Sequence, residues 1–172
     1  MKYTELDTPS LLIDQDIMMA NIGKMQKYAD VQGVALRPHT KTHKAPYLAK
    51  LQRDAGCKGI TVAKIGEAEV MAENGLDDIF IANEPVGDMK LKRILKLMET
   101  KQISFGVDCP EHVEAADRVF AGSGKHAQVV VEIEVGENRS GIIEESRFME
   151  LLDSIQKAEN VDFLGVFSHE GH

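Results

Sequence analysis

The segment Leu36-Arg37-Pro38-His39-Thr40-Lys41-Thr42-His43-Lys44 places five basic or potentially basic side chains around one proline. It lies in a chain of 172 residues whose formal net charge is -8. Because it follows Val34-Ala35 and precedes a helical pattern, we expect the end of a strand that runs into a loop. Alternation along a strand would give one face Arg37, His39, Lys41 and His43. Such groups repel one another unless an anionic or electron-withdrawing group lies between them, so this segment is a candidate site.

The rest of the chain alternates short β-branched runs with amphipathic stretches. This pattern predicts strands at residues 10–14, 34–36, 59–65, 78–82, 103–107, 128–135 and 163–167. It predicts helices at residues 16–28, 45–55, 67–74, 88–100, 111–120 and 144–158. Strands separated by single helices indicate βαβ units and a parallel sheet.

This order favours an α/β barrel of the (β/α)8 TIM type over a dinucleotide-binding fold, since no glycine-rich phosphate motif follows the first βα-type strand. After the first strand and helix, about six barrel strands can be counted. The expected organisation is one incomplete barrel domain over residues 1–172, without a linker or second domain. Such a barrel has an open edge, so we expect a fragment, a truncated gene product or an edge that a partner covers.

The composition is that of an ordinary globular protein, 43% hydrophobic and 28% charged. The 28 acidic and 20 basic residues argue against a general nucleic-acid or anionic-membrane surface. No apolar run approaches the roughly 20 residues that span a bilayer, and the first residues form no apolar signal core. Cys57 and Cys109 belong to no paired-cysteine motif, so we expect reduced thiols in a cytoplasmic protein.

Lys41 is the first candidate for chemistry. A lysine at the C-terminal end of a barrel strand, flanked by cationic groups, has a destabilised ammonium form. That environment favours the free amine that Schiff-base chemistry needs. The alternative is a solvated basic loop.

A second candidate site lies in residues 132–141, with the sequence EIEVGENRSG. Alternation would put Glu132 and Glu134 on one face of a Val-rich strand. If that face is the barrel interior, the two carboxylates need a cationic partner, which the Lys41 strand offers. Arg139 follows a glycine-containing turn and is placed to reach a cofactor oxygen. The alternative is a strand end with an ion pair in an exposed loop.

The third candidate is the terminal segment Ser168-His169-Glu170-Gly171-His172, at the expected mouth of a strand. Together with His39 and His43, its two histidines follow predicted strand ends. This placement is compatible with a zinc site, but Gly171 disfavours the helical turn that a metal-binding pair needs, and a satisfied polar pocket is favoured. The remaining histidines, His112 and His126, carry no signal of function.

Taken together, several segments resemble the D-threonine aldolase and D-serine dehydratase family, which are alanine racemase-like, fold-type III pyridoxal 5'-phosphate (PLP) enzymes. The matching segments are residues 7–14 (DTPSLLID), 21–22 (NI), 36–44 (LRPHTKTHK), 63–68 (AKIGEA), 78–83 (DIFIAN), 106–108 (GVD) and 132–141 (EIEVGENRSG). The RPHxKTHK element is highly specific, and the others support the resemblance in combination. The match corresponds to the family's N-terminal, PLP-binding barrel, without its C-terminal β-domain.

The resemblance implies that Lys41 is the catalytic lysine and forms the internal aldimine with PLP. It also implies that His39, Arg139 and His169 lie at the cofactor, with Arg139 on the side of the ring hydroxyl. The family's phosphate-binding loops follow its last barrel strands, and its divalent-metal ligands lie in the C-terminal domain. Neither region has a counterpart in these 172 residues.

The activity that the resemblance implies is that of a PLP-dependent lyase acting on D-3-hydroxy amino acids, with cleavage to glycine and an aldehyde. A D-serine dehydratase, an amino-acid racemase of the same fold and a non-catalytic PLP-binding fragment remain open as alternatives. The expected partner is a small-molecule D-amino acid rather than a nucleic acid or a membrane. Both the resemblance and the open barrel edge favour a homodimer.

Overall fold

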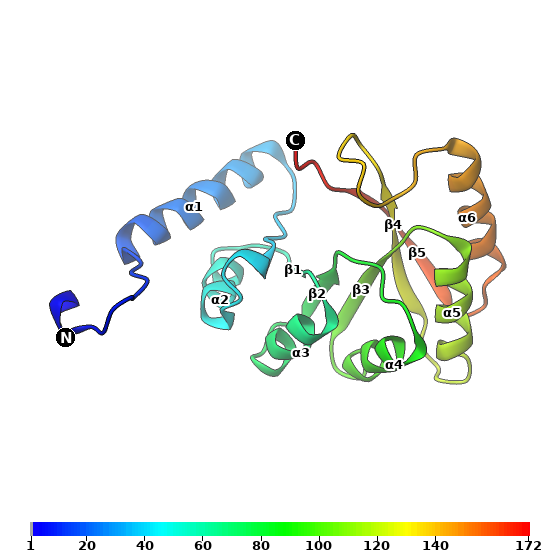
Figure 1. Cartoon of the computed structure of the whole chain (residues 1–172), viewed down its shortest axis with the longest axis horizontal. Coiled ribbons are helices and arrows are strands. Elements are labelled where there is room, and N and C mark those ends of the chain that lie inside the picture. The colour runs from blue at the N-terminus through cyan, green and yellow to red at the C-terminus, as the bar shows by residue number, and fades with distance from the viewer. Residues whose placement is uncertain (1) are drawn as a thin grey trace.

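Five parallel strands form one sheet whose spatial order follows the chain (Figure 1). The computed structural model describes residues 2–172. The strands are β1 (Ile60–Val62), β2 (Asp78–Ile81), β3 (Gln102–Val107), β4 (Ala127–Ile133) and β5 (Val161–Ser168). The helices are α1 (Gln15–Gln32), α2 (Pro46–Asp54), α3 (Ile65–Glu73), α4 (Asp88–Leu97), α5 (Pro110–Phe120) and α6 (Glu145–Lys157), with 3-10 turns η1 (Tyr3–Glu5) and η2 (Thr40–Thr42). From residue 45 onward, every predicted helix and strand is confirmed.

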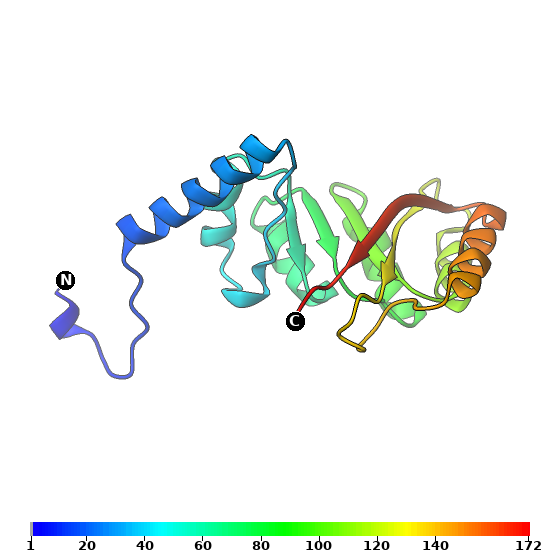
Figure 2. The same ribbon diagram turned by 90° about the horizontal axis from the view of Figure 1, so that it is seen from above.

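Helices α3 to α6 cover one face of the sheet, and their packing forms the core (Figure 2). The strand side chains on that face are almost inaccessible to solvent and include Ile79, Ile81, Phe105, Val107, Val129 and Val131. Burial at every second position follows from the two-residue repeat of a strand. Because each strand connects to the next through a helix, all strands run in the same direction.

The opposite face of the sheet is concave, as the interior of a barrel would be. The rings of Phe80 in β2 and Phe167 in β5 meet edge to face with centroids 4.9 Å apart, although β3 and β4 separate their strands. Neighbouring strands lie about 4.8 Å apart, so only a strongly curled sheet brings these rings together. The fold is therefore an α/β arrangement consistent with an incomplete TIM-type barrel, as predicted.

The prediction of a barrel strand at residues 34–36 is wrong, and the sheet has five strands rather than about six. The carbonyls of Leu36 and Pro38 accept hydrogen bonds from Lys58 N–H at 3.0 Å and Thr61 N–H at 2.8 Å. Beyond these contacts, only an isolated bridge joins His39 to Thr61. Pro38 has no N–H to donate, so the segment lies against β1 without forming a continuous ladder.

The predicted strand at residues 10–14 is also absent. This segment leads into α1, where the Asp14 carboxylate accepts a hydrogen bond from Ile17 N–H at 3.0 Å and caps the helix. No strand within residues 2–172 pairs with it, and Leu11, Leu12 and Ile13 are exposed. A strand without a ladder partner leaves its backbone groups to water, so apolar β-branched sequence alone does not create one.

The open edge expected of an incomplete barrel is present at β5, which pairs only with β4 among the described residues. Phe163, Leu164 and Val166 of this strand are 44–55% exposed. Helix α1 is similarly uncovered, since Gln26 and Ala29 are its only buried residues. Within residues 2–172, no helix has the length and apolar character required to cross a membrane.

Replacement of Gly106 in β3 by alanine is expected to destabilise the fold by roughly 1–3 kcal/mol, the usual cost of overpacking. A Cβ at this position would lie 3.0 Å from Glu84 Oε1 and 3.1 Å from both Asn83 O and Phe167 Cζ. Chemical denaturation measures the change. Gly23→Ala in exposed α1 is the matched control, because nothing lies within 4 Å of its new Cβ and alanine favours a helix. Equal stability of the two variants would contradict the packing argument.

Candidate functional site

The carboxyl ends of the parallel strands meet at one edge of the sheet, where barrel enzymes place their catalytic groups. The segments that reach this edge follow the 36–38 stretch and each strand in turn, at residues 39–43, 63–67, 83–84, 108–112, 134–141 and 169–172. They contain all four sequence-predicted site residues, Lys41, His39, Arg139 and His169. Arg139 and His169 follow β4 and β5, whereas His39 and Lys41 follow a stretch that forms no strand.

Lys41 lies in the 3-10 turn η2, which the buried Thr40 anchors to the sheet. Thr40 Oγ1 donates a hydrogen bond to Thr61 O at 3.1 Å, and Thr40 O accepts one from Lys44 N–H at 2.8 Å. The Lys41 side chain is exposed and forms no ion pair with any of residues 2–172. The backbone at Lys41 is therefore fixed, and the side-chain amine is not paired with a carboxylate of residues 2–172.

His39 lies directly beside Lys41. Its Nδ1 accepts a hydrogen bond from the Lys41 backbone N–H at 3.2 Å, so the proton of the neutral ring is on Nε2. Burial lowers the pKa of His39, and the positive charge of Lys41 lowers it further, with a smaller contribution from His169. The ring is therefore neutral near pH 7, which reduces the repulsion that the sequence predicts around Lys41.

The other basic groups of this segment do not share a face with Lys41, which corrects the sequence prediction. Arg37 forms a bidentate ion pair with Asp78, at 2.7 and 2.9 Å, at the amino end of β2. His43 Nδ1 accepts the Ala45 N–H at 3.0 Å. The 3-10 turn replaces the alternation of a strand, so successive side chains diverge.

Lys44 leaves the Lys41 site as well, since it forms an ion pair with Glu67 at 3.3 Å. Glu67 also accepts a hydrogen bond from Ala63 N–H at 2.9 Å. A carboxylate near the basic segment is therefore already committed to Lys44 and to the backbone. Of the five basic side chains quoted at the outset, His39 and Lys41 are the two that remain together at the strand ends.

Arg139 and His169 are brought together by one carboxylate, Glu137. Arg139 Nη1 lies 3.4 Å from Glu137 Oε2, and His169 Nδ1 lies 2.7 Å from the same oxygen. The loop after β4 and the segment after β5 are thus connected. The charge of His169 also contributes to the lowered pKa of His39, so these two histidines influence each other across the strand edge.

Glu132 and Glu134 have separate environments, contrary to the prediction that both face a cation from the Lys41 strand. Glu134 lies in the loop, where its Oε1 accepts hydrogen bonds from Gly136 N–H at 2.7 Å and Asn138 N–H at 2.6 Å. These bonds lower the pKa of Glu134. Glu132 is 4% exposed on the barrel-interior face, and its neighbour is another acid, Glu84.

Sequence reasoning missed Glu84, which follows β2 and has a strongly perturbed pKa. Burial raises the pKa of Glu84 to about 8, and the adjacent Glu132 and Asp108 carboxyl groups act in the same direction. Glu84 Oε1 is buried and has no hydrogen-bond partner within residues 2–172, so the uncharged form of this carboxyl group is favoured. The absence of a Cβ at Gly106 leaves room for the Glu84–Glu132 pair, a relation that sequence spacing does not reveal.

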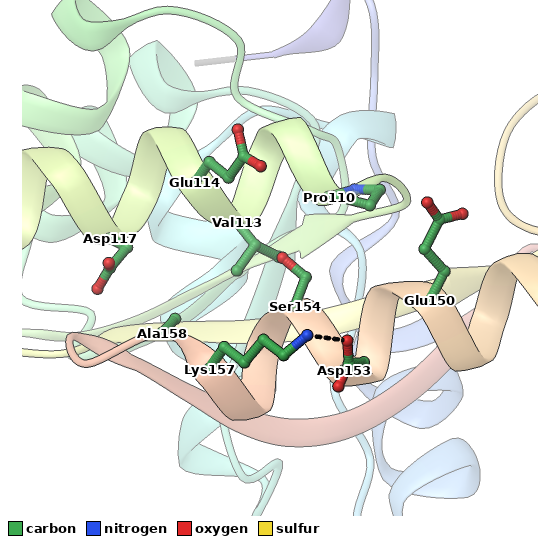
Figure 3. Close-up of a pocket in the computed structure, with 9 residues that line it drawn as sticks. All are labelled: Pro110, Val113, Glu114, Asp117, Glu150, Asp153, Ser154, Lys157 and Ala158. Carbon is green, nitrogen blue, oxygen red and sulfur yellow. Dashed lines mark hydrogen bonds and ion pairs between the residues drawn. The ribbon is translucent and has the colours of Figure 1, made fainter.

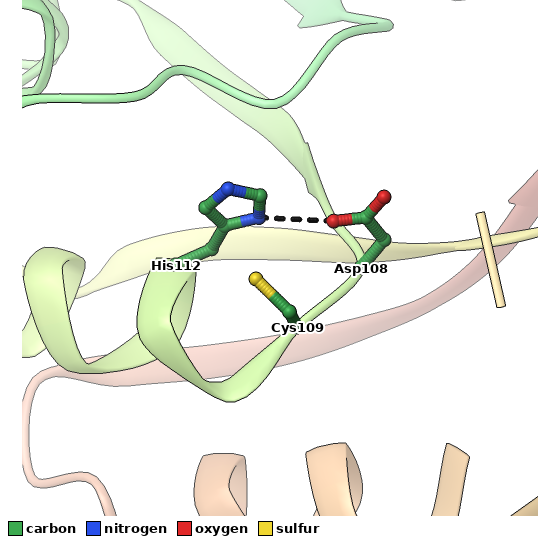
Figure 4. A group of neighbouring side chains, drawn as sticks. All are labelled: Asp108, Cys109 and His112. Carbon is green, nitrogen blue, oxygen red and sulfur yellow. Dashed lines mark ion pairs between the residues drawn. The ribbon is translucent and has the colours of Figure 1, made fainter. Parts of the chain in front are cut away.

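Sequence reasoning also missed Asp108, Cys109 and His112, which form a cluster at the junction of β3 and α5 (Figure 4). His112 Nδ1 lies 3.1 Å from Asp108 Oδ1, and this neighbour holds the pKa of Asp108 below its ordinary value. The sequence carried no signal of function at His112, which nevertheless belongs to this cluster. His39, His43, His169 and His172 form no three-donor cluster among residues 2–172, whereas His112 belongs to one.

A separate groove of about 340 Å³ lies between α5 and α6 on the outer, helical layer (Figure 3). Its lining carries Glu114, Asp117, Glu150 and Asp153, with Lys157 paired to Asp153. These acidic side chains come from two solvent-facing helices, and none of the predicted site residues lines the groove. The candidate site is therefore the edge of the sheet that carries Lys41.

A parallel sheet that curls as a barrel, with a free lysine at its carboxyl edge, defines a class of α/β barrel proteins with a lysine-centred site. The sequence model of the family described as "Alanine racemase, N-terminal domain" matches residues 13–172. The chain belongs to this family.

Named relatives agree with the resemblance found in the sequence. The D-threonine aldolase of Arthrobacter sp. is 35% identical over 166 residues, which cover 96% of this chain and 44% of that protein. The 3-hydroxy-D-aspartate aldolase of Paracoccus denitrificans is 30% identical, over 99% of this chain and 45% of that protein.

Solved structures show the same fold. The crystal structure of D-threonine aldolase from Filomicrobium marinum superposes with a TM-score of 0.94 at 32% identity, over 98% of this chain and 46% of that one. D-threo-3-hydroxyaspartate dehydratase from Delftia sp. HT23 superposes with a TM-score of 0.89 at 33% identity, over 96% of this chain and 44% of that one. The chain spans a little under half the length of these relatives.

Proposed function

We propose that these 172 residues are the lysine-bearing part of a PLP-dependent lyase acting on D-3-hydroxy amino acids, with D-threonine aldolase-like cleavage as the leading reaction. The observation that carries this proposal is the Lys41 amine, unpaired and beside a neutral His39 at the carboxyl edge of the sheet. The relatives named for aldol cleavage or dehydration of 3-hydroxy-D-amino acids support the substrate class.

The residues present fit the cofactor at its reactive end. A PLP aldehyde requires a primary amine that is not held by a carboxylate, and Lys41 supplies one. When bound, PLP supplies an electron sink for the substrate carbon next to the amino group. Lys41 would hold the cofactor, and Arg139 would lie on the side of its ring hydroxyl.

His39 and His169 have distinct proposed roles around the lysine. His39 is neutral and fixes the Lys41 backbone through Nδ1, so it would orient the lysine without adding charge. His169 Nδ1 lies 2.7 Å from Glu137 Oε2, a contact that supports a fixed ring orientation, and the ring would lie beside the cofactor. We place the phosphate-binding groups and the divalent-metal ligands in the half of the relatives that this chain does not match.

We further propose that residues 1–172 form a single, incomplete barrel domain of a cytoplasmic homodimer. The open β5 edge and the uncovered α1 support self-association or coverage by further chain, because exposed apolar faces of this kind are normally buried. Size-exclusion chromatography with light scattering tests the dimer, and a monomer across the accessible concentration range would oppose it.

Product analysis tests the reaction. With PLP and a divalent metal present, D-threonine is expected to give glycine and acetaldehyde in equal amounts. Ammonia and a keto acid would instead assign a dehydratase, which the 38% identity to the Delftia D-threo-3-hydroxyaspartate dehydratase makes the second candidate. Interconversion of D- and L-alanine would assign a racemase, and PLP binding without turnover would assign a non-catalytic PLP-binding chain.

A further inference from the structure

The cluster at the start of α5 combines three kinds of metal-binding donor. Asp108 is the first residue after β3, Cys109 precedes the helix, and His112 lies on its first turn. A hydrogen bond from His112 N–H to Cys109 O at 3.2 Å closes that turn. As a result, a carboxylate oxygen, a thiol sulfur and an imidazole nitrogen all lie within 4.8 Å of one another (Figure 4).

The fold uses only part of the bonding capacity of the three donors, since Cys109 interacts with Glu111 and Asp108 with the Gly141 N–H. The Cys109 side chain makes no capping hydrogen bond to α5. His112 Nδ1 is buried and, although it lies 3.1 Å from Asp108 Oδ1, it forms no hydrogen bond of good geometry. The nitrogen and oxygen atoms that bind one tetrahedral zinc ion lie about 3.3 Å apart. The distance between His112 Nδ1 and Asp108 Oδ1 is close to that value.

The Asp108 carboxylate is also held in place from its other side. Gly141 N–H donates to Asp108 Oδ2 at 3.4 Å, which leaves Oδ1 directed toward His112. Such support from outside the donor set is what orients the ligands of metal sites. The side chains of Asp108 and His112 are 25% and 20% exposed, so an ion can enter the site from solvent.

We propose that Asp108, Cys109 and His112 form a binding site for a thiophilic divalent transition metal of the Zn²⁺ class, with a fourth position open to water. A thiolate with an imidazole and one carboxylate selects Zn²⁺ or Co²⁺ over Mg²⁺ and Ca²⁺, which prefer oxygen ligands. The site uses none of the proposed PLP-contacting residues. Metal binding at this site can therefore be tested independently of the proposed lyase activity.

Titration of the whole chain with Co²⁺, free of PLP and under reducing conditions without competing thiols, tests the site. One Co²⁺ should bind per chain and produce a sulfur-to-cobalt charge-transfer band, which added Zn²⁺ should displace. Cys109→Ser should abolish the band, and His112→Ala should weaken binding by at least about tenfold. Asp108→Asn provides a second variant at a ligand should the cysteine variant fail to fold.

Two matched controls separate this site from the other donors. Cys57→Ser removes the other thiol, which is buried and donates to Gly59 O, and it should retain the band. His172→Ala alters the terminal histidine segment and should also retain it. Circular dichroism establishes that each variant is folded. Absence of saturable Co²⁺ binding, or a band that survives in Cys109→Ser, would overturn the proposal.

Discussion

Lys41→Ala is expected to abolish the absorbance band that PLP acquires on covalent attachment to the protein. If the whole enzyme is the proposed lyase, turnover should fall by roughly 10³-fold or more, as expected for loss of a covalent catalytic group. The reason is structural: Lys41 is the amine that η2 presents at the strand edge, and it forms no ion pair among the described residues. Absorbance spectroscopy with borohydride trapping and mass analysis measures the attachment.

Lys44→Ala is the matched control for this experiment, because it removes a nearby lysine that is engaged by Glu67 at 3.3 Å. It should retain the band and a reduced adduct at Lys41. The fold should survive the Lys41 change, since the side chain is exposed and the turn is anchored through Thr40. An adduct that persists in folded Lys41→Ala would rule out this lysine as the attachment point.

Glu84→Gln is expected to stabilise the fold above neutral pH and to flatten its pH dependence. The folded pKa of Glu84 is about 8, above its ordinary value of 4.5, because of burial and the neighbouring Glu132 and Asp108. The unfolded chain therefore releases a proton that the folded chain retains, and stability falls as pH rises from about 4.5 to about 8. After allowance for partial solvent access, the gain at pH 8 should be roughly 1–2 kcal/mol.

Denaturant unfolding at several pH values, with a chelator present, measures this effect. Glu134→Gln is the matched control because Glu134 has a lowered pKa, so its contribution is lost as pH falls and does not produce the alkaline slope. It should leave that slope unchanged. If Glu84→Gln retains the wild-type loss of stability between pH 5 and 8, the raised pKa of Glu84 is not the cause of that loss.

The order of helices and strands after residue 45 could be predicted because each segment has enough apolar residues at a 2 or 3.6 repeat to bury one face. The strands predicted at residues 10–14 and 34–36 are absent from the structure, because a strand requires a hydrogen-bonded partner strand as well as suitable side chains. Leu11–Ile13 has no partner among the described residues, and Pro38 cannot continue the ladder with β1.

The candidate site shows the same division. Lys41, His39, Arg139 and His169 could be proposed from the sequence, the first two from a specific motif and the others from their place after predicted strands. The proximity of Glu84 and Glu132 could not be predicted from the sequence. It depends on the space above Gly106 and on the curl of the sheet that brings Phe167 toward Phe80. Neither distance nor burial across strands is encoded in the local spacing of these residues.

By itself, then, the sequence determined a parallel α/β chain of the barrel type, a lysine at its carboxyl edge and the resemblance to D-threonine aldolases. These properties depend on local repeats and on one specific motif. Only the tertiary structure decided that the basic groups of residues 37–44 separate, that His39 stays neutral beside Lys41, and that acids and metal-type donors gather at neighbouring strand ends. Charge state and donor geometry depend on which side chains meet across strands, and folding alone brings those side chains together.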